Sequence, residues 1–150
     1  MDIRYGVRAL DLIFEEGKVV GVIAEKDGQQ FSLRAESTVI ASGGFEASPE
    51  MRAEHLGERW ENARVRGTLY NVGDMLKAAL KIGAAKGGDW ETCHSVQWDA
   101  NPEINESNIE LTNRLTRQSY FLGLLVNNEG KRFLDEGADF RNCTYAKYGK

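Results

Sequence analysis

The first third of the chain places apolar residues at the spacing of short β-strands. Three runs follow this pattern: Val7–Phe14, Val19–Glu25 and Gln30–Ala35. Turn residues separate the runs, first Glu15–Lys18 and then the pair Asp27-Gly28, which favours a hairpin because glycine takes positive φ without strain. The pattern predicts an antiparallel β-meander. Such a small sheet needs a second layer to pack against.

A fourth apolar run leads into a pair of glycines. Thr38–Phe45 reads Thr-Val-Ile-Ala-Ser-Gly-Gly-Phe. Its β-branched start predicts a buried strand, and the glycines remove Cβ atoms where that strand ends. A strand end of this kind lets another backbone or a flat ligand approach closely. An ordinary turn after a core strand is the simpler explanation of a lone Gly-Gly pair.

Two short helices are predicted after the glycine pair. The first begins at Ser48–Glu50, where a hydroxyl cap precedes a proline and an acid, and it ends near Gly57. The second covers Met75–Ile82, with Asp74 as its cap and apolar residues along one side. Free amides at the start of that helix attract anions and hydroxyl groups, although a plain cap without a ligand is the simpler interpretation.

The last third of the chain is less regular. Asn101–Thr116 is polar and poorly periodic, which is typical of long functional or disordered loops. Ser119–Asn127 is strand-like, and Asn128–Lys131 predicts a turn. Arg141 follows an acidic patch that would hold its guanidinium group in place for bidentate binding of a carboxylate. A surface cluster of ion pairs is the simpler explanation of that patch.

Composition narrows the classes of function without naming one. The chain has 150 residues with 41% hydrophobic and 28% charged residues, which is typical of one soluble globular domain. Its net charge of −4 makes nucleic acid an unfavourable partner, and no apolar run is long enough for a membrane helix. The start of the chain lacks the apolar core of a signal peptide, and the two cysteines have no metal-binding spacing, so we expect a cytoplasmic protein without a metal. The sequence contains no GxSxG, P-loop, HExxH or GxGxxG motif.

The order of the motifs resembles the succinate dehydrogenase/fumarate reductase flavoprotein superfamily. The resemblance rests on the following ordered set: the Val-x-Gly-Val meander, Ala41–Phe45, Gly73-Asp74 opening a helix that ends at Ile82–Ala84, Val126–Phe133, and the downstream segment of acids and arginine. Within the superfamily, Val65–Asn71 and Asp135–Gly149 look most like the FAD-dependent tricarballylate dehydrogenases. The resemblance covers most of the chain, from about residue 7 to 150.

The resemblance implies FAD as the cofactor. Ala41, Ser42, Gly43 and Gly44 match the family's Ala-Thr-Gly-Gly, whose glycines line the FAD. Asp74 matches the aspartate of the family's Thr-Gly-Asp-Gly, although this chain reads Val-Gly-Asp-Met. Ala9 falls near the strand position that meets the adenine.

The same resemblance implies a reaction and its residues. Arg141 matches the arginine that donates or accepts the proton in fumarate reductases, and Asp99 falls near the family's substrate-binding histidine. Arg114 and Arg117 would join Arg141 in clamping a polycarboxylate substrate. The implied reaction dehydrogenates a polycarboxylic acid, of the tricarballylate to cis-aconitate type, with hydride transfer to the flavin. Two alternatives stay open: another branch, such as a fumarate reductase or a 3-ketosteroid dehydrogenase, and a stand-alone binding or scaffold module.

The implied fold class is α+β (α/β), a β-meander and core strand of an FAD-binding domain joined to part of a mixed α+β substrate-capping domain. Residues 1–94 would belong to the first domain and residues 95–150 to the second. Because the family's GxGxxG unit is absent, we expect a middle fragment that holds little FAD and is inactive alone. The expected partners are the small-molecule substrate, an electron-accepting membrane protein and a second copy bound through truncated surfaces. The full-length protein is expected in the cytoplasm or at the inner membrane's surface.

Overall fold

The computed structural model describes residues 2–65, 67–93 and 122–138. The chain divides into two compact units, which are described separately. The first comprises Met1–Ser48 and Tyr70–Gly88, and the second comprises Pro49–Leu69 and Asp89–Lys150. A small antiparallel sheet with short helices makes the described part α+β at a coarse level.

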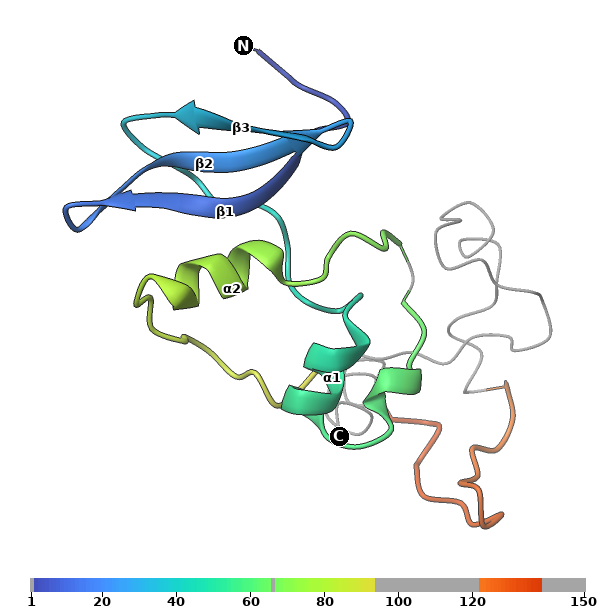
Figure 1. Ribbon diagram of the computed structural model, residues 1–150. Coiled ribbons are helices and arrows are strands. Elements are labelled where there is room, and N and C mark those ends of the chain that lie inside the picture. Colours follow the sequence, from blue (N-terminus) through green and yellow to red (C-terminus); the bar gives the residue numbers. More distant parts are fainter. Residues whose placement is uncertain (1, 66, 94–121, 139–150) are drawn as a thin grey trace. The chain divides into compact units, whose positions relative to one another are not determined.

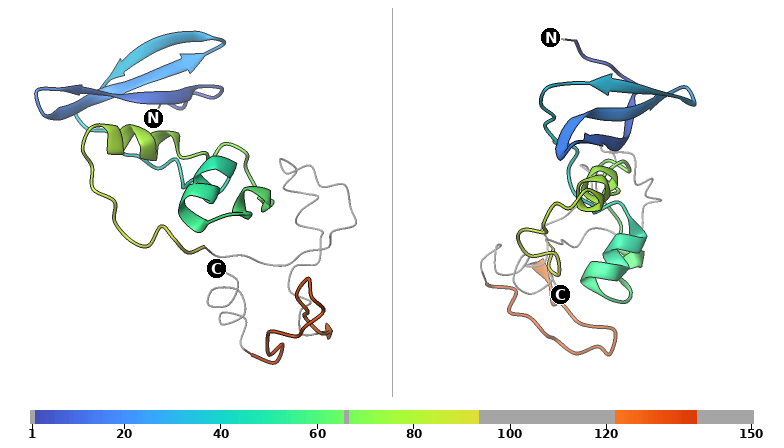
Figure 2. Two further views of the ribbon diagram at one scale, coloured as in Figure 1. Left: turned by 60° about the horizontal axis from the view of Figure 1, so that its bottom comes forward. Right: turned by 60° about the vertical axis from the view of Figure 1, so that its left-hand side comes forward.

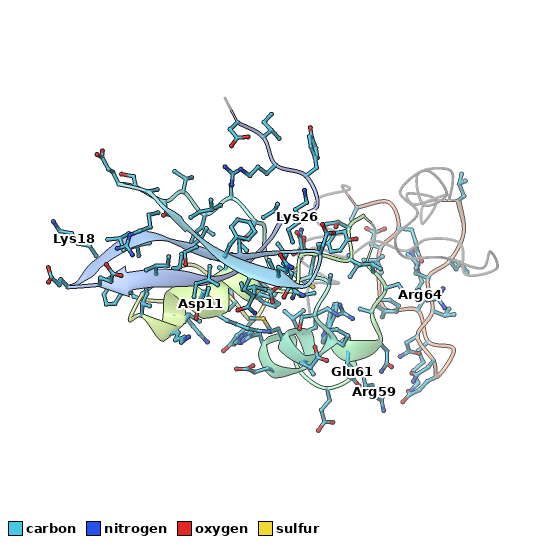
Figure 3. The ribbon with its side chains drawn as sticks, turned by 45° about the horizontal axis from the view of Figure 1, so that its top comes forward. Asp11, Lys18, Lys26, Arg59, Glu61 and Arg64 are labelled. Carbon is cyan, nitrogen blue, oxygen red and sulfur yellow. The ribbon has the colours of Figure 1, made fainter. Side chains whose placement is uncertain are left out.

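The first unit begins with the predicted β-meander. The strands β1 (Arg8–Glu15), β2 (Lys18–Lys26) and β3 (Gln29–Arg34) form an antiparallel sheet in the order β1-β2-β3 (Figure 1). Figure 3 shows Lys18 and Lys26 at opposite ends of β2. The β2–β3 turn has positive φ at both central residues, 51° at Asp27 and 77° at Gly28, which matches the twist of a hairpin. The meander and its Asp-Gly turn are confirmed.

The helix α2 (Asp74–Lys81) supplies the second layer of this unit. It packs against the sheet at β1, as both Figure 1 and Figure 2 show. The buried core there consists of Leu12, Met75 and Ala78, flanked by the partly buried side chains of Ala9, Val19, Val22, Ala79 and Ile82. At the rim, the Lys81 ammonium group donates a hydrogen bond to Asp11, which Figure 3 shows on β1 beside the helix.

The start of α2 differs from the prediction that Asp74 is its cap. Gly73 occupies the cap position with φ of 76°, and no side chain makes a capping hydrogen bond. Asp74 is the first helical residue, and its carboxylate accepts hydrogen bonds from Arg8 at 3.1 and 2.6 Å. The prediction was wrong because glycine takes the left-handed conformation required here, while a distant arginine binds the carboxylate.

The predicted buried strand at the start of Thr38–Phe45 does not form. The last hydrogen bond to the sheet joins the Ala35 amide to the Val20 carbonyl oxygen at 3.0 Å. Beyond it, Val39 is 89% exposed and Ile40 is 42% exposed. A strand requires a neighbour for its backbone groups, and no described strand lies beside this segment. The β-branched pattern therefore gives an extended, exposed segment instead of a core strand.

The second unit contains α1 (Pro49–Leu56) and the 3₁₀ turn η1 (Trp60–Asn62). The helix starts at the predicted proline and ends before Gly57, whose φ is 107°. Arg52 is buried in α1, and its guanidinium group donates hydrogen bonds to the Trp60 and Glu61 carbonyl oxygens at 2.8 and 2.9 Å. Figure 3 labels Glu61 close to α1. A buried arginine thus fastens the turn to the helix.

Residues 122–138 contain a tight turn around Asn127–Lys131 and have little strand character. The side chain of Asn127 accepts hydrogen bonds from the Glu129 and Lys131 amides at 3.0 and 2.9 Å, so the predicted turn at Asn128–Lys131 is confirmed. The predicted strand Ser119–Asn127 is reduced, in its described part, to the single bridge between Val126 and Arg132. Residues 119–121 lie outside the described residues.

Candidate functional site

Two loops of the first unit meet beside the start of α2. The Gly73 amide donates a hydrogen bond to the Gly44 carbonyl oxygen at 3.1 Å, and the Ala47 amide donates one to the Asn71 carbonyl oxygen at 2.9 Å. These backbone bonds hold the glycine pair of the first loop against the residues that precede the helix. The predicted site residues Gly44 and Asp74 are therefore brought into one neighbourhood.

The side chain of Asn71 strengthens this connection. Its amide nitrogen donates a hydrogen bond to Glu46 at 2.5 Å. Gly43 has φ of 80°, and a Cβ atom added there would lie 2.8 Å from the Asn71 amide nitrogen. The Asn71 side chain therefore packs directly on the bare backbone of Gly43. A residue with a side chain at position 43 would strain the backbone and displace this amide.

The other predicted cofactor residues lie in two different settings. Ala41, Ser42 and Gly43 are exposed and Gly44 is half-buried, so this segment presents a surface of small residues. Ala9 is half-buried in β1, where it packs against the core that contains Leu12. The structure thus places Ala9 in the contact between sheet and helix.

Arg8 is a partner of Asp74 that the sequence pattern did not reveal. Its guanidinium group binds the Asp74 carboxylate through Nε at 3.1 Å and Nη2 at 2.6 Å. This hydrogen bond, with the charge of Asp74, raises the pKa of Arg8. The two residues are 66 positions apart, so no local spacing could have indicated the pair. Arg8 on β1 therefore orients the Asp74 carboxylate at the start of α2 and balances its negative charge.

Four of the predicted site residues lie outside the described residues: Asp99, Arg114, Arg117 and Arg141.

Burial raises the pKa of the half-buried Cys93 thiol, which favours its uncharged form. Within residues 2–65, 67–93 and 122–138, no three histidine, cysteine or acidic side chains gather as a metal would require. None of the helices in those same stretches has the length and apolar character of a membrane span.

Glu136 forms a second polar cluster. In the sequence it belongs to the acidic patch predicted to hold Arg141, but in the described residues its carboxylate binds Arg132. Its side chain is buried, 6% exposed, and accepts a hydrogen bond from the Leu125 amide at 2.7 Å. The Arg132 guanidinium group donates to the same carboxylate from Nε at 2.9 Å and Nη2 at 2.5 Å. These bonds, led by that from Arg132, lower the pKa of Glu136 to about 2. The spacing of an acid four residues after an arginine was the available signal.

The low pKa of Glu136 predicts a loss of stability in acid. Because the pKa in the folded chain is about 2 and the ordinary value is 4.5, the carboxylate stabilises the fold fully above pH 4.5. Its contribution is expected to fall as the pH drops from 4.5 towards 2. Carboxyl NMR titration measures the pKa directly, and Glu136→Gln should flatten this part of the stability profile. Glu129→Gln, at an exposed side chain in the same turn, is the matched control. A midpoint near 4.5 for Glu136 would contradict the prediction.

Sequence comparison identifies relatives along nearly the whole chain. Residues 1–149 match the FAD binding domain family. The 3-oxosteroid 1-dehydrogenase of Mycolicibacterium smegmatis is 30% identical over 146 residues, which are 93% of this chain and 24% of the relative. The chain thus spans about a quarter of the length of the 3-oxosteroid 1-dehydrogenases it matches.

Solved structures of flavoenzymes share the fold. The 3-ketosteroid Δ1-dehydrogenase of Sterolibacterium denitrificans, in complex with 1,4-androstadiene-3,17-dione, is 25% identical with a TM-score of 0.57, over 67% of this chain and 18% of that one. The open conformation of a flavocytochrome c3 fumarate reductase is 22% identical with a TM-score of 0.64, over 89% and 22%. These similarities favour the alternative branch of the resemblance over the tricarballylate dehydrogenases. The chain belongs to the FAD-binding domain family, whose cofactor is FAD.

Proposed function

We propose that this chain is part of an FAD-dependent oxidoreductase that moves hydrogen to or from a carbon–carbon bond beside a carbonyl or carboxyl group. The observation that carries the proposal is the family match over residues 1–149. Relatives named 3-oxosteroid 1-dehydrogenase and fumarate reductase act on bonds of this kind, and they favour this reaction class. Because the chain spans 24% of its steroid-dehydrogenase relative, the activity is proposed for the full-length protein.

Two features of the joined loops support a flavin nucleotide site there. Ala41, Ser42 and Gly43 are small and exposed, so a flat ring can approach this segment on the part that Asn71 and Glu46 do not cover. The Asp74 carboxylate, held by Arg8, offers fixed acceptors for the hydroxyl groups of such a ligand. When bound, FAD supplies the acceptor for the hydrogen that leaves the substrate. The residues of this chain bind and orient the cofactor.

The proposal assigns the remaining roles from the family resemblance. Arg141 would move the proton, while Asp99 would contact the substrate. Residues 1–94 would belong to the cofactor-binding domain and residues 95–150 to the part that covers the substrate. An arginine serves a proton transfer only when neighbouring groups fix its geometry, as the acids before position 141 would do.

Two classes of substrate are candidates, and their chemistry distinguishes them. A 3-oxosteroid is favoured by the 30% identity to a 3-oxosteroid 1-dehydrogenase. A polycarboxylic acid of the tricarballylate type is the second candidate, favoured by Arg114, Arg117 and Arg141, whose guanidinium groups would bind carboxylates bidentately. A steroid offers no carboxylate to such a cluster, so the two readings predict different ligands.

Anaerobic absorbance spectroscopy of the full-length, FAD-loaded protein distinguishes these classes. A 3-oxosteroid is expected to bleach the visible flavin absorbance, whereas a 3-hydroxysteroid of the same skeleton, the matched control ligand, should leave it unchanged. Bleaching by tricarballylate or succinate alone would instead establish the polycarboxylate reading. A purified protein that carries no flavin, or a flavin that no ligand of either class bleaches, would overturn the proposed function.

A further inference from the structure

We infer that Asn71 is a positioning residue for the cofactor: through Glu46, it fixes the Gly43–Gly44 backbone beside the start of α2. This inference rests on the proposed function, since it concerns the loop proposed to meet the FAD. It adds residues that neither the family motif nor the resemblance assigned. Asn71 and Glu46 do not belong to the predicted site, and they are 25 positions apart in the sequence.

Asn71 contacts the glycine loop in three ways. Its side-chain amide donates a hydrogen bond to Glu46 at 2.5 Å. Its backbone carbonyl oxygen accepts a hydrogen bond from the Ala47 amide at 2.9 Å. A Cβ atom added to Gly43 would lie 2.8 Å from the side-chain nitrogen of Asn71, so this side chain packs against the bare glycine. One residue therefore contacts the glycine pair at Gly43 and the two residues Glu46 and Ala47 that follow the pair.

The opposite loop carries the start of α2. Asn71 is followed after one residue by Gly73, whose amide donates to the Gly44 carbonyl oxygen at 3.1 Å. A shift of Asn71 would therefore move the glycine backbone relative to Asp74. Binding a rigid cofactor depends on such spacing, because a loop that must be ordered on binding costs affinity.

The chemistry of the pair requires a donor at position 71. An amide donates to the Glu46 carboxylate, whereas a carboxylate at position 71 would be an acceptor only. Asn71→Asp keeps the side-chain size and places two carboxylates at hydrogen-bond distance, where they repel. Glu46→Gln in the same chain restores one donor and one acceptor with the direction of the bond reversed. The double variant is therefore a specific rescue.

The test measures FAD binding to the full-length apoprotein by quenching of flavin fluorescence. At pH 8, Asn71→Asp is expected to weaken binding by about tenfold or more, while the Asn71→Asp/Glu46→Gln double variant recovers most of the affinity. Between pH 8 and 5, the affinity of Asn71→Asp should rise relative to that of the wild type, because one of the two carboxyl groups takes up a proton. A residue that served folding alone would not give this pH dependence of affinity together with the rescue.

Asn62→Asp is the matched control. The Asn62 amide also donates to a glutamate carboxylate, that of Glu61 at 3.1 Å, but it lies in the second unit. This change should leave FAD affinity within about twofold of the wild type, because the hydrogen bond joins two adjacent residues of the second unit and does not connect the glycine loop to the start of α2. If the wild type binds FAD and Asn71→Asp binds it equally well at pH 8, the inference is wrong and the proposed function stands. If the wild type binds no FAD, the proposed function itself has failed.

Discussion

Gly21→Ala is expected to separate β3 from β2 and to lower the free energy of unfolding by about 3–5 kcal/mol. Gly21 is buried in β2 with φ of 152°, and it pairs with Arg34 across the sheet. A Cβ atom there would lie 2.1 Å from the Leu33 carbonyl oxygen and 2.9 Å from the Arg34 Cα atom. Both are backbone atoms of the neighbouring strand, so the overlap can be relieved only by opening the pairing. Chemical denaturation of the variant measures the loss.

Gly17→Ala separates steric overlap from backbone strain. Gly17 lies in the turn between β1 and β2 with φ of 79°, and an added Cβ atom would meet nothing within 4 Å. This control variant should lose only about 1–2 kcal/mol, the cost of left-handed backbone in a residue with a side chain. Equal stability of the two variants would show that β3 does not approach Gly21 as closely as described.

The sequence predicted the elements that neighbouring residues determine. Turn chemistry at Asp27-Gly28 sets the hairpin, and a proline at position 49 marks the first turn of α1. Gly83, with φ of 96°, follows the end of α2 as predicted. In each case the conformation of a few adjacent residues decides where the element begins or ends, so one sequence carries the signal.

Features that depend on distant partners could not be predicted in this way. The apolar run at Val39 and Ile40 has the composition of a core strand, yet strand formation depends on a neighbouring backbone that the run cannot specify. Asp74 has a residue type that suits a helix cap, but Arg8 binds its carboxylate from a position 66 residues away. A local pattern indicates what a residue can do, and the fold decides which partner it meets.

In the candidate site, too, neighbouring residues carried a signal in the sequence and distant partners did not. The glycine pair at 43 and 44 was recognisable as a place of close approach, although the sequence could not distinguish a turn from a ligand contact. The structure adds a reason for the first glycine, because the Asn71 amide packs where its side chain would be. Asn71 entered the sequence analysis only as the last residue of Val65–Asn71 and without a role, since asparagine before a Val-Gly pair is equally typical of an ordinary loop.

Gly43→Ala is expected to weaken FAD binding by the full-length protein about tenfold or more and to lower its free energy of unfolding by about 2–4 kcal/mol. Gly43 has φ of 80°, which strains any residue with a side chain. The added methyl group would also lie 2.8 Å from the Asn71 amide nitrogen, so that amide must turn away and release Glu46. Flavin fluorescence gives the affinity, and thermal unfolding of the apoprotein gives the stability.

Two variants separate the causes of this effect. Gly28→Ala has a similar φ of 77° and open space around its Cβ position, so it should show the strain without a loss of FAD affinity. Asn71→Ala, added to Gly43→Ala, removes the overlapping amide. The double variant should recover the part of the stability that is lost to overlap, but not the part lost to the φ of 80°, and not the affinity, because the contact that positions the loop is gone. Recovery of both would mean that the methyl group acts by steric overlap alone. Unchanged affinity in Gly43→Ala would show that this backbone does not line the FAD.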